Sequence, residues 1–185
     1  MRFMQRLLLA SAAMMLPMMM AACTTATLPP EKQAAVDQSQ AVRTEIDELN
    51  QLTRIYIDSV TIYQEAANKS NDLHGLKPAV IEIAQERNRQ RVQLQDRVIA
   101  LGGTPAEYGE ASGTVRRSMS SIRSILQDDN KVALEEVLRT ERYILREVNE
   151  AMSKTVTAQS RQLLGQLRTD ADQQIARLEA IGNPG

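Results

Sequence analysis

The stretch VRTEIDELNQLTRIYIDSVTIYQEAA, residues 42–67, carries two apolar stripes at helical spacing. The first stripe, with steps of four and three residues, consists of Val42, Ile46, Leu49, Thr53, Tyr56, Val60, Tyr63 and Ala67. The second stripe lies beside it and consists of Leu52, Ile55, Ser59, Ile62 and Ala66. A helix with two adjoining stripes is covered by more than one neighbour, so this stretch predicts a long helix inside a helical bundle.

Clustered glycine, proline and acidic residues divide the rest of the chain into further helices. We expect a second helix from Pro78 to Leu101, stopped by Gly102-Gly103-Thr104-Pro105. A third helix should begin at Asp128-Asp129-Asn130, which is a strong start signal, and a fourth should run from about Thr157 to Ile181.

The connections between these helices define the predicted topology. Tight turns join the first helix to the second and the third to the fourth, and a long crossover joins the two pairs. The crossover should contain a short amphipathic helix with Val115, Met119, Ile122, Ile125 and Leu126. Two hairpins with a crossover are typical of the ferritin-like bundle, so the expected fold class is an all-α, ferritin-like four-helix bundle with a long first helix.

Residues 1–22 have the layout of a secretory signal peptide, with a basic start, an uncharged apolar run and small residues before Cys23. The run is interrupted by Pro17 and is too short for a good membrane-spanning helix. Ala21-Ala22-Cys23 resembles the lipobox of bacterial lipoproteins, although Met20 stands where leucine is usual. The resemblance implies cleavage before Cys23, a diacylglycerol on its thiol and an acyl chain such as palmitate on the new amino terminus. An ordinary cleaved signal with a spare thiol is the alternative.

An acylated Cys23 would anchor the chain to a lipid bilayer, because two or three acyl chains give stable binding. Thr24 stands where, by the same resemblance, an aspartate would retain the protein in the inner membrane. We therefore expect the periplasmic face of the outer membrane. Residues 23–30 would form the acylated tether, residues 31–45 a helical extension, and residues 46–182 the bundle.

Composition excludes one class of partner. Of the 22 Lys and Arg, Arg2 and Arg6 lie in the leader, so 20 positive and 23 negative residues remain after it. Because this part of the chain has no basic patch, nucleic acid is not an expected partner. Cys23 is the only cysteine, so no internal disulfide can form and stability must come from packing.

Several short motifs, in their order and spacing, resemble a bacterial ferritin-like family, the domain of unknown function 2383. They are Leu49-Asn50-Gln51-Leu52, Tyr63-Gln64-Glu65-Ala66-Ala67, Glu86-Arg87, Leu101-Gly102-Gly103-Thr104-Pro105, Gly113-Thr114-Val115-Arg116-Arg117, Asp128-Asp129 and Thr140-Glu141. The resemblance covers about residues 46–181 and implies a fold without an assigned activity. The family is expected to be mostly cytoplasmic, so the leader is a departure from it.

Ferritin-like enzymes bind two metals with a Glu from each of two helices and a Glu-x-x-His from each of the other two. Here Arg89 follows Glu86 by three residues, and Asp172 stands where the family's fourth-helix histidine falls. The single histidine, His74, lies in a turn, where a solvated cap is expected. Both motifs are broken, so we expect no cofactor.

A metal site without histidine is the alternative. Its carboxylates would be Glu65, Glu86, Glu141 and Asp172, and the protein would then be an iron or manganese oxidase or a metal-storage protein.

Residues 86–91, Glu-Arg-Asn-Arg-Gln-Arg, place six polar side chains in the middle of the second helix. The preferred interpretation has them facing solvent, with arginine stems covering apolar neighbours. In the other interpretation they are the remnant of a metal layer, in which Arg87 or Arg91 replaces the metal charge against Glu65 or Glu141. A buried cation is costly without a partner, so that interpretation requires a carboxylate from another helix near the arginine.

The expected function is that of a non-enzymatic, membrane-anchored envelope lipoprotein whose bundle is a scaffold or binding module. Its partners would be the bilayer and an envelope protein or a second copy of the chain, bound through the helical extension. A coiled-coil spacer between membrane and cell wall is a further alternative. The tyrosines Tyr56, Tyr63, Tyr108 and Tyr143 are expected to pack with their hydroxyls at the rim of the bundle.

Overall fold

A computed structural model describes residues 30–70, 75–109 and 129–183. The predicted leader, Cys23, the tether up to residue 29, the crossover helix and His74 lie outside the described residues, and Pro30, predicted as the last tether residue, is the first residue of the first helix. Among the described residues, no helix has both the length and the apolar character needed to cross a bilayer.

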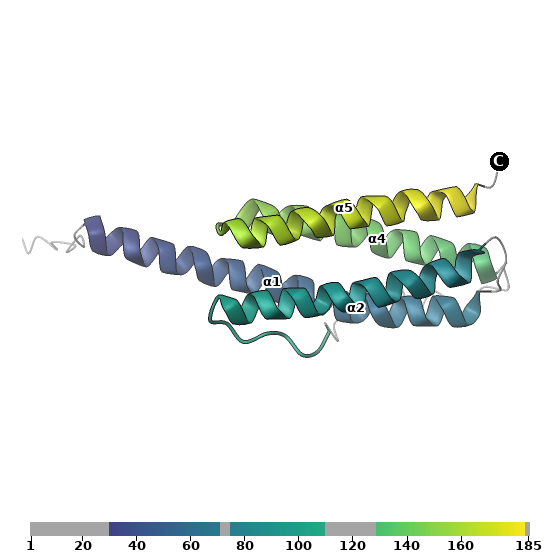
Figure 1. Cartoon of the computed structure of the whole chain (residues 1–185), viewed down its shortest axis with the longest axis horizontal. Coiled ribbons are helices and arrows are strands. Elements are labelled where there is room, and N and C mark those ends of the chain that lie inside the picture. The colour runs from purple at the N-terminus through teal and green to yellow at the C-terminus, as the bar shows by residue number, and fades with distance from the viewer. Residues whose placement is uncertain (1–29, 71–74, 110–128, 184–185) are drawn as a thin grey trace, which may run out of the picture.

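The described residues form four α-helices and no strand: α1 (Pro30–Lys69), α2 (Leu76–Ala100), α4 (Asp129–Lys154) and α5 (Ala158–Gly182). Figure 1 shows α1 beside α2 and α4 beside α5, with the two hairpins packed together along α1 and α4. This arrangement confirms the predicted all-α four-helix bundle.

The helix ends follow the glycine and proline signals closely. Helix α2 begins at Leu76, two residues before Pro78, so the proline lies in the first turn, where its missing N–H costs nothing. At its other end, Gly102 has a φ of 81°, which favours glycine, and its N–H donates to Ile99 O at 2.9 Å. Gly103 packs tightly, because an added Cβ would lie 2.7 Å from Ile46 Cγ2.

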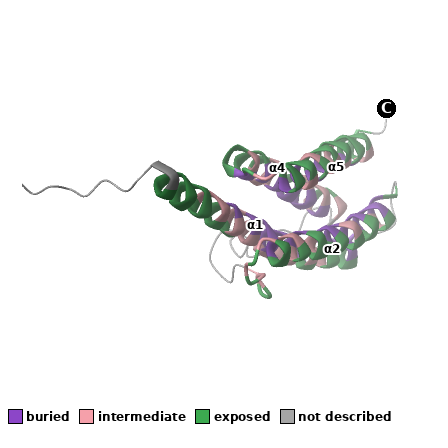
Figure 2. Cartoon of the chain, turned by 60° about the vertical axis from the view of Figure 1, so that its left-hand side comes forward, coloured by how far each residue is buried: buried purple, intermediate pink, exposed green. Residues whose placement is uncertain are grey.

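The apolar core consists of two clusters at different levels of the bundle. Buried residues, purple in Figure 2, occur on all four helices. The proximal cluster lies toward the projecting end of α1 and contains Leu49, Leu52, Ile55, Tyr56, Leu94, Val98, Ile144, Val148, Ala151, Leu164, Leu167 and Ala171. The distal cluster contains Ile62, Tyr63, Ala66, Ala67, Leu76, Val80, Ile83, Ala84, Ala133, Val137 and Leu178. Most members of the two predicted α1 stripes are buried in these clusters, whereas Val42, Ile46 and Val60 are half-buried.

The first part of α1 projects beyond the other helices (Figure 1), and its residues 32–40 are exposed. Glu45, predicted to be the last residue of this extension, is instead fully buried against the α4–α5 turn. The bundle contacts therefore begin at or before Glu45.

Candidate functional site

A hydrogen-bonded polar layer lies between the two apolar clusters. It consists of Tyr63 from α1, Arg87 and Gln90 from α2, Glu141 from α4 and Asp170 from α5, so all four helices contribute to it. Arg87 Nε donates to Glu141 Oε1 at 3.0 Å, and its Nη2 forms an ion pair with Oε2. Tyr63 donates to Glu141 Oε1 at 2.6 Å. Arg87 Nη1 donates to the Gln90 side-chain oxygen, and Gln90 Nε2 donates to Asp170 Oδ2 at 2.8 Å.

Both members of the central ion pair are removed from solvent. The side chains of Arg87 and Glu141 are 0% exposed. Burial alone would lower the pKa of Arg87, but the charge of Glu141 raises it above its usual value, so the guanidinium keeps its proton. Burial also raises the pKa of Tyr63, with the adjacent Glu141 acting in the same direction, so its hydroxyl remains a donor.

The preferred interpretation of residues 86–91 as a solvent-facing stripe is therefore wrong for two of the six. Arg87 and Gln90 point into the core because they share a helix face with Ile83 and Leu94. Arg91 is not part of the layer, since its Nε donates to Asn88 Oδ1 at 3.0 Å and its Nη1 to Gln95 Oε1 at 2.9 Å. Of the contacts that the other interpretation named, the structure shows Arg87 with Glu141 and does not place Arg91 or Glu65 in the layer.

The tyrosine hydroxyls also differ from expectation. Tyr56 and Tyr63 are 0% exposed, so their hydroxyls lie in the core and not at the rim. Tyr108, in contrast, is 80% exposed.

The four carboxylates of the alternative metal site are not brought together. Glu86 lies at the surface and forms an ion pair with Arg89, Asp172 is exposed, and Glu65 is half-buried. Only Glu141 lies in the layer, and the carboxylate that α5 supplies there is Asp170, which the sequence reasoning did not identify. In the described part of the chain, no group of three or more His, Cys, Asp or Glu could hold a metal ion.

The chemistry of the layer does not fit a di-metal centre. Such a centre needs several carboxylates to bridge the ions and imidazoles to complete the shell. Here both oxygens of Glu141 already accept hydrogen bonds, and the group between them and Gln90 is a guanidinium, which has donors and no acceptor. A metal ion at this place would be repelled by Arg87.

A second buried polar cluster, which we call the Glu45 cluster, joins α1 to the start of α5. Val156 and Thr157 each donate a backbone N–H to Glu45 Oε2 at 2.9 Å, and the Thr157 hydroxyl donates to Oε1. Arg97 donates to Ser160 Oγ at 2.7 Å and to Thr157 Oγ1 at 2.9 Å. Glu45 thus caps the N-terminus of α5 from another helix.

The environment of Glu45 favours its charged form. Burial would raise the pKa of this carboxyl, but hydrogen bonds from the Ser160 and Thr157 hydroxyls and from the Thr157 and Val156 N–H groups lower it below its ordinary value. Sequence reasoning missed this residue, although Glu45 precedes Leu49 by four positions and so lies on the buried face of α1.

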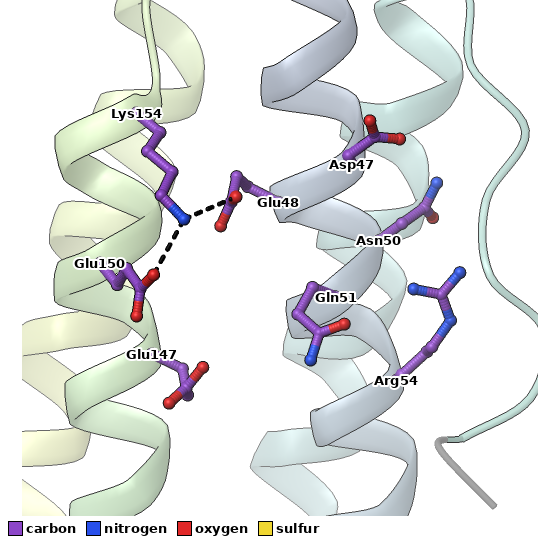
Figure 3. Close-up of a pocket in the computed structure, with 8 residues that line it drawn as sticks. All are labelled: Asp47, Glu48, Asn50, Gln51, Arg54, Glu147, Glu150 and Lys154. Atoms are coloured by element: carbon purple, nitrogen blue, oxygen red, sulfur yellow. Dashed lines mark hydrogen bonds and ion pairs between the residues drawn. The ribbon is translucent and has the colours of Figure 1, made fainter. Parts of the chain in front are cut away.

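A surface pocket of about 500 Å³ lies between α1 and α4 (Figure 3). Its lining is polar and consists of Asp47, Glu48, Asn50, Gln51, Arg54, Glu147, Glu150 and Lys154. Lys154 Nζ donates to Glu48 Oε1 and to Glu150 Oε1, both at 2.9 Å, so it links the two helices. This arrangement is a solvated ion-pair network on the bundle surface.

Comparison with known proteins identifies the family. The model of the family described as Domain of unknown function (DUF2383) matches residues 44–154, which is more than half of the chain. The chain belongs to the DUF2383 family. Tyr63, Arg87 and Glu141 lie within the DUF2383 match, whereas Asp170 and the whole of α5 follow it.

Two solved structures share the fold of this DUF2383 chain. One is a ferritin like, diiron-carboxylate protein from Bacillus anthracis str. Ames, with a TM-score of 0.60 and 17% identity over 77% of this chain and 98% of that chain. The other is a conserved hypothetical protein from Mycobacterium tuberculosis, with a TM-score of 0.63 and 12% identity over 76% of this chain and 92% of that chain. At these identities the likeness shows the ferritin-like fold alone. No curated protein matches this chain.

Proposed function

We propose that this chain is a lipid-anchored envelope protein whose ferritin-like bundle is a non-catalytic scaffold or binding module. The observation that carries the proposal is the buried Arg87–Glu141 ion pair at the centre of the bundle. Arginine cannot act as a metal ligand at neutral pH, because its guanidinium stays protonated and offers no lone pair. In this proposal the charge of Glu141 is balanced by Arg87, so the core needs no bound metal ion.

The bonding of the layer supports a structural role. Glu141 accepts hydrogen bonds from α1 and α2, and Gln90 connects Arg87 to Asp170 on α5. A buried polar network is stable only when all its hydrogen bonds form together. The layer therefore favours the one arrangement of the two hairpins in which these bonds are made. A rigid bundle of this kind suits a protein that positions a partner.

The membrane anchor is proposed from Cys23 and its lipobox-like surroundings. The part of α1 before Glu45, residues 30–44, would lie between the acylated cysteine and the bundle. At 1.5 Å per helical residue it is about 22 Å long, so it would hold the bundle away from the bilayer surface. Its exposed residues are then the natural contact surface for an envelope partner or a second copy of the chain.

An oxygen-consumption assay tests the non-catalytic part of the proposal. The purified protein is mixed with Fe(II) in aerobic buffer, and the initial rate of oxygen uptake is recorded with an electrode. We expect the same rate as with Arg87→Ala and Glu141→Ala variants or with buffer alone. A saturable rate above the buffer rate that disappears in the Glu141→Ala variant would identify an iron oxidase and refute the proposal.

Metabolic labelling tests the anchor separately. Cells that express the full chain are grown with labelled palmitate, and the protein is recovered from the membrane and soluble fractions. We expect label on the wild type in the membrane fraction, and neither label nor membrane association for Cys23→Ser. An unlabelled, soluble wild-type protein would contradict lipid anchoring and leave the account of the polar layer unaffected.

A further inference from the structure

The hydroxyl of Tyr56 is an unexplained polar group in the core. Tyr56 is 0% exposed, and its hydroxyl oxygen is one of the buried side-chain atoms without a hydrogen-bond partner among the described residues. A buried tyrosine hydroxyl normally finds a partner, because leaving it unpaired costs free energy. Tyr56 lies two helical turns before Tyr63 on the same stripe, and its ring belongs to the proximal apolar cluster.

The surroundings of Tyr56 are polar on the side of the layer. The Arg87 guanidinium carbon lies 5.6 Å from the centre of the Tyr56 ring. Burial raises the pKa of Tyr56, so its hydroxyl keeps its proton. Asp170 lies next to Ala171 on α5, and Ala171 belongs to the same proximal cluster as Tyr56. The hydroxyl therefore remains a neutral donor facing charged groups.

The polar layer has unused hydrogen-bonding capacity on two of its members. Arg87 Nη1 and Nη2 carry two hydrogens each, and one bond from each nitrogen is observed, to Gln90 and to Glu141. Asp170 accepts from Gln90 through Oδ2, and among the described residues no hydrogen bond to its Oδ1 is observed.

We propose that an internal water molecule binds to the Tyr56 hydroxyl and bridges it to Arg87 and Asp170. A buried water typically makes two to four hydrogen bonds, and a hydroxyl donor, a guanidinium N–H and a carboxylate oxygen supply that number with both polarities. A water fits better than a cation, because Arg87 already provides the positive charge. The bridged water extends the polar layer from Tyr63 to Tyr56 and joins the two apolar clusters through hydrogen bonds.

Water relaxation measurements on the full-length protein test this site. The ¹⁷O magnetic relaxation dispersion of water counts long-lived internal molecules, and it is compared for wild type, Tyr56→Phe and the exposed control Tyr108→Phe. We expect one internal water fewer in Tyr56→Phe and an unchanged count in the control. An unchanged count in Tyr56→Phe overturns the proposal.

Equilibrium unfolding in urea gives a second test, because Tyr56→Phe should change stability differently when the hydroxyl holds a water and when it has no partner. If the hydroxyl holds a bridging water, Tyr56→Phe lowers the folding equilibrium constant by about five- to tenfold, the size of one lost hydrogen bond. If the hydroxyl is buried without a partner, its removal leaves the constant unchanged or raises it, and this outcome overturns the proposal. The Tyr108→Phe control should match wild type, because that ring is 80% exposed.

Discussion

Replacing Arg87 by methionine removes the central cation and keeps most of the side-chain volume. The change leaves the Glu141 carboxylate fully buried with the Tyr63 hydroxyl as its remaining partner, and it removes the donor to Gln90. Removing one member of a buried ion pair costs about 3–5 kcal/mol, because the other charge is left uncompensated. The hydrophobic contacts of the methionine do not offset this loss.

This loss is large on the scale of a single domain. Domains of this size unfold with a free energy of about 5–15 kcal/mol, so Arg87→Met should remove about a fifth or more of the free energy of unfolding. Each kcal/mol corresponds to a change in Tm of about 2–4 °C for a domain of 150–250 residues, which gives a decrease of about 10 °C.

The assay is urea unfolding followed by far-UV circular dichroism, with Arg89→Met as the matched control. Arg89 lies two residues away on α2 and also pairs with a glutamate, Glu86, but its side chain is 65% exposed. An exposed pair contributes about 0–1 kcal/mol, so the control should remain close to wild type. An equal loss of stability in Arg87→Met and Arg89→Met would show that the buried ion pair contributes no more than the exposed one.

The remaining predictions use the same unfolding assay. Glu141→Gln added to Arg87→Met should recover at least about 1 kcal/mol, because the buried charge is removed; strictly additive losses would contradict the coupling. Glu45→Gln should lower stability at neutral pH. The difference from wild type should shrink as the pH falls below the ordinary carboxyl value of 4.5, because a lowered pKa in the folded state stabilises the charged form; a pH-independent difference would contradict this assignment. Gly103→Ala should cost about 1–3 kcal/mol, since its Cβ would lie 2.7 Å from Ile46 Cγ2. Gly165→Ala, with open space around the Cβ, should raise the free energy of unfolding by about 0.5–1 kcal/mol. If both glycine substitutions changed this free energy in the same direction, the difference in packing between the two sites would be contradicted.

The bundle itself could be predicted because its signals are local and repeated. Two stripes on α1 specify a helix with more than one neighbour, and Gly102 and Gly103 stop α2 through backbone conformation and close packing. Such features depend on helical period and steric constraints, which act within a few residues of each other.

The orientation of the polar layer was harder to predict because α2 has apolar residues on two faces. Ile83 and Leu94 mark the buried face, and the steps from 83 to 87, 90 and 94 continue it. Val92 and Ile99, however, are exposed on the opposite side. With apolar residues on both faces, the helical phase is ambiguous, and the interpretation of polar residues as solvated is then preferred.

Asp170 and Glu45 were missed for a different reason. Each acts through a partner that is distant in sequence, Gln90 for Asp170 and the α4–α5 turn for Glu45. The pairing of α5 with α2 and of α1 with that turn is decided by how the hairpins pack, which no local pattern specifies. The resemblance to ferritin-like proteins placed the ligand position of α5 at Asp172, which is exposed.

Metal content decides whether Arg87 and Glu141 leave room for a di-metal centre. The full-length protein is incubated anaerobically with Fe(II) and, separately, with Mn(II). Unbound ions are removed by desalting, and the bound metal is measured by inductively coupled plasma mass spectrometry. We expect a stoichiometry far below one metal per chain, unchanged in Glu86→Ala and Glu141→Ala. About two metals per chain, lost in those variants, would contradict it.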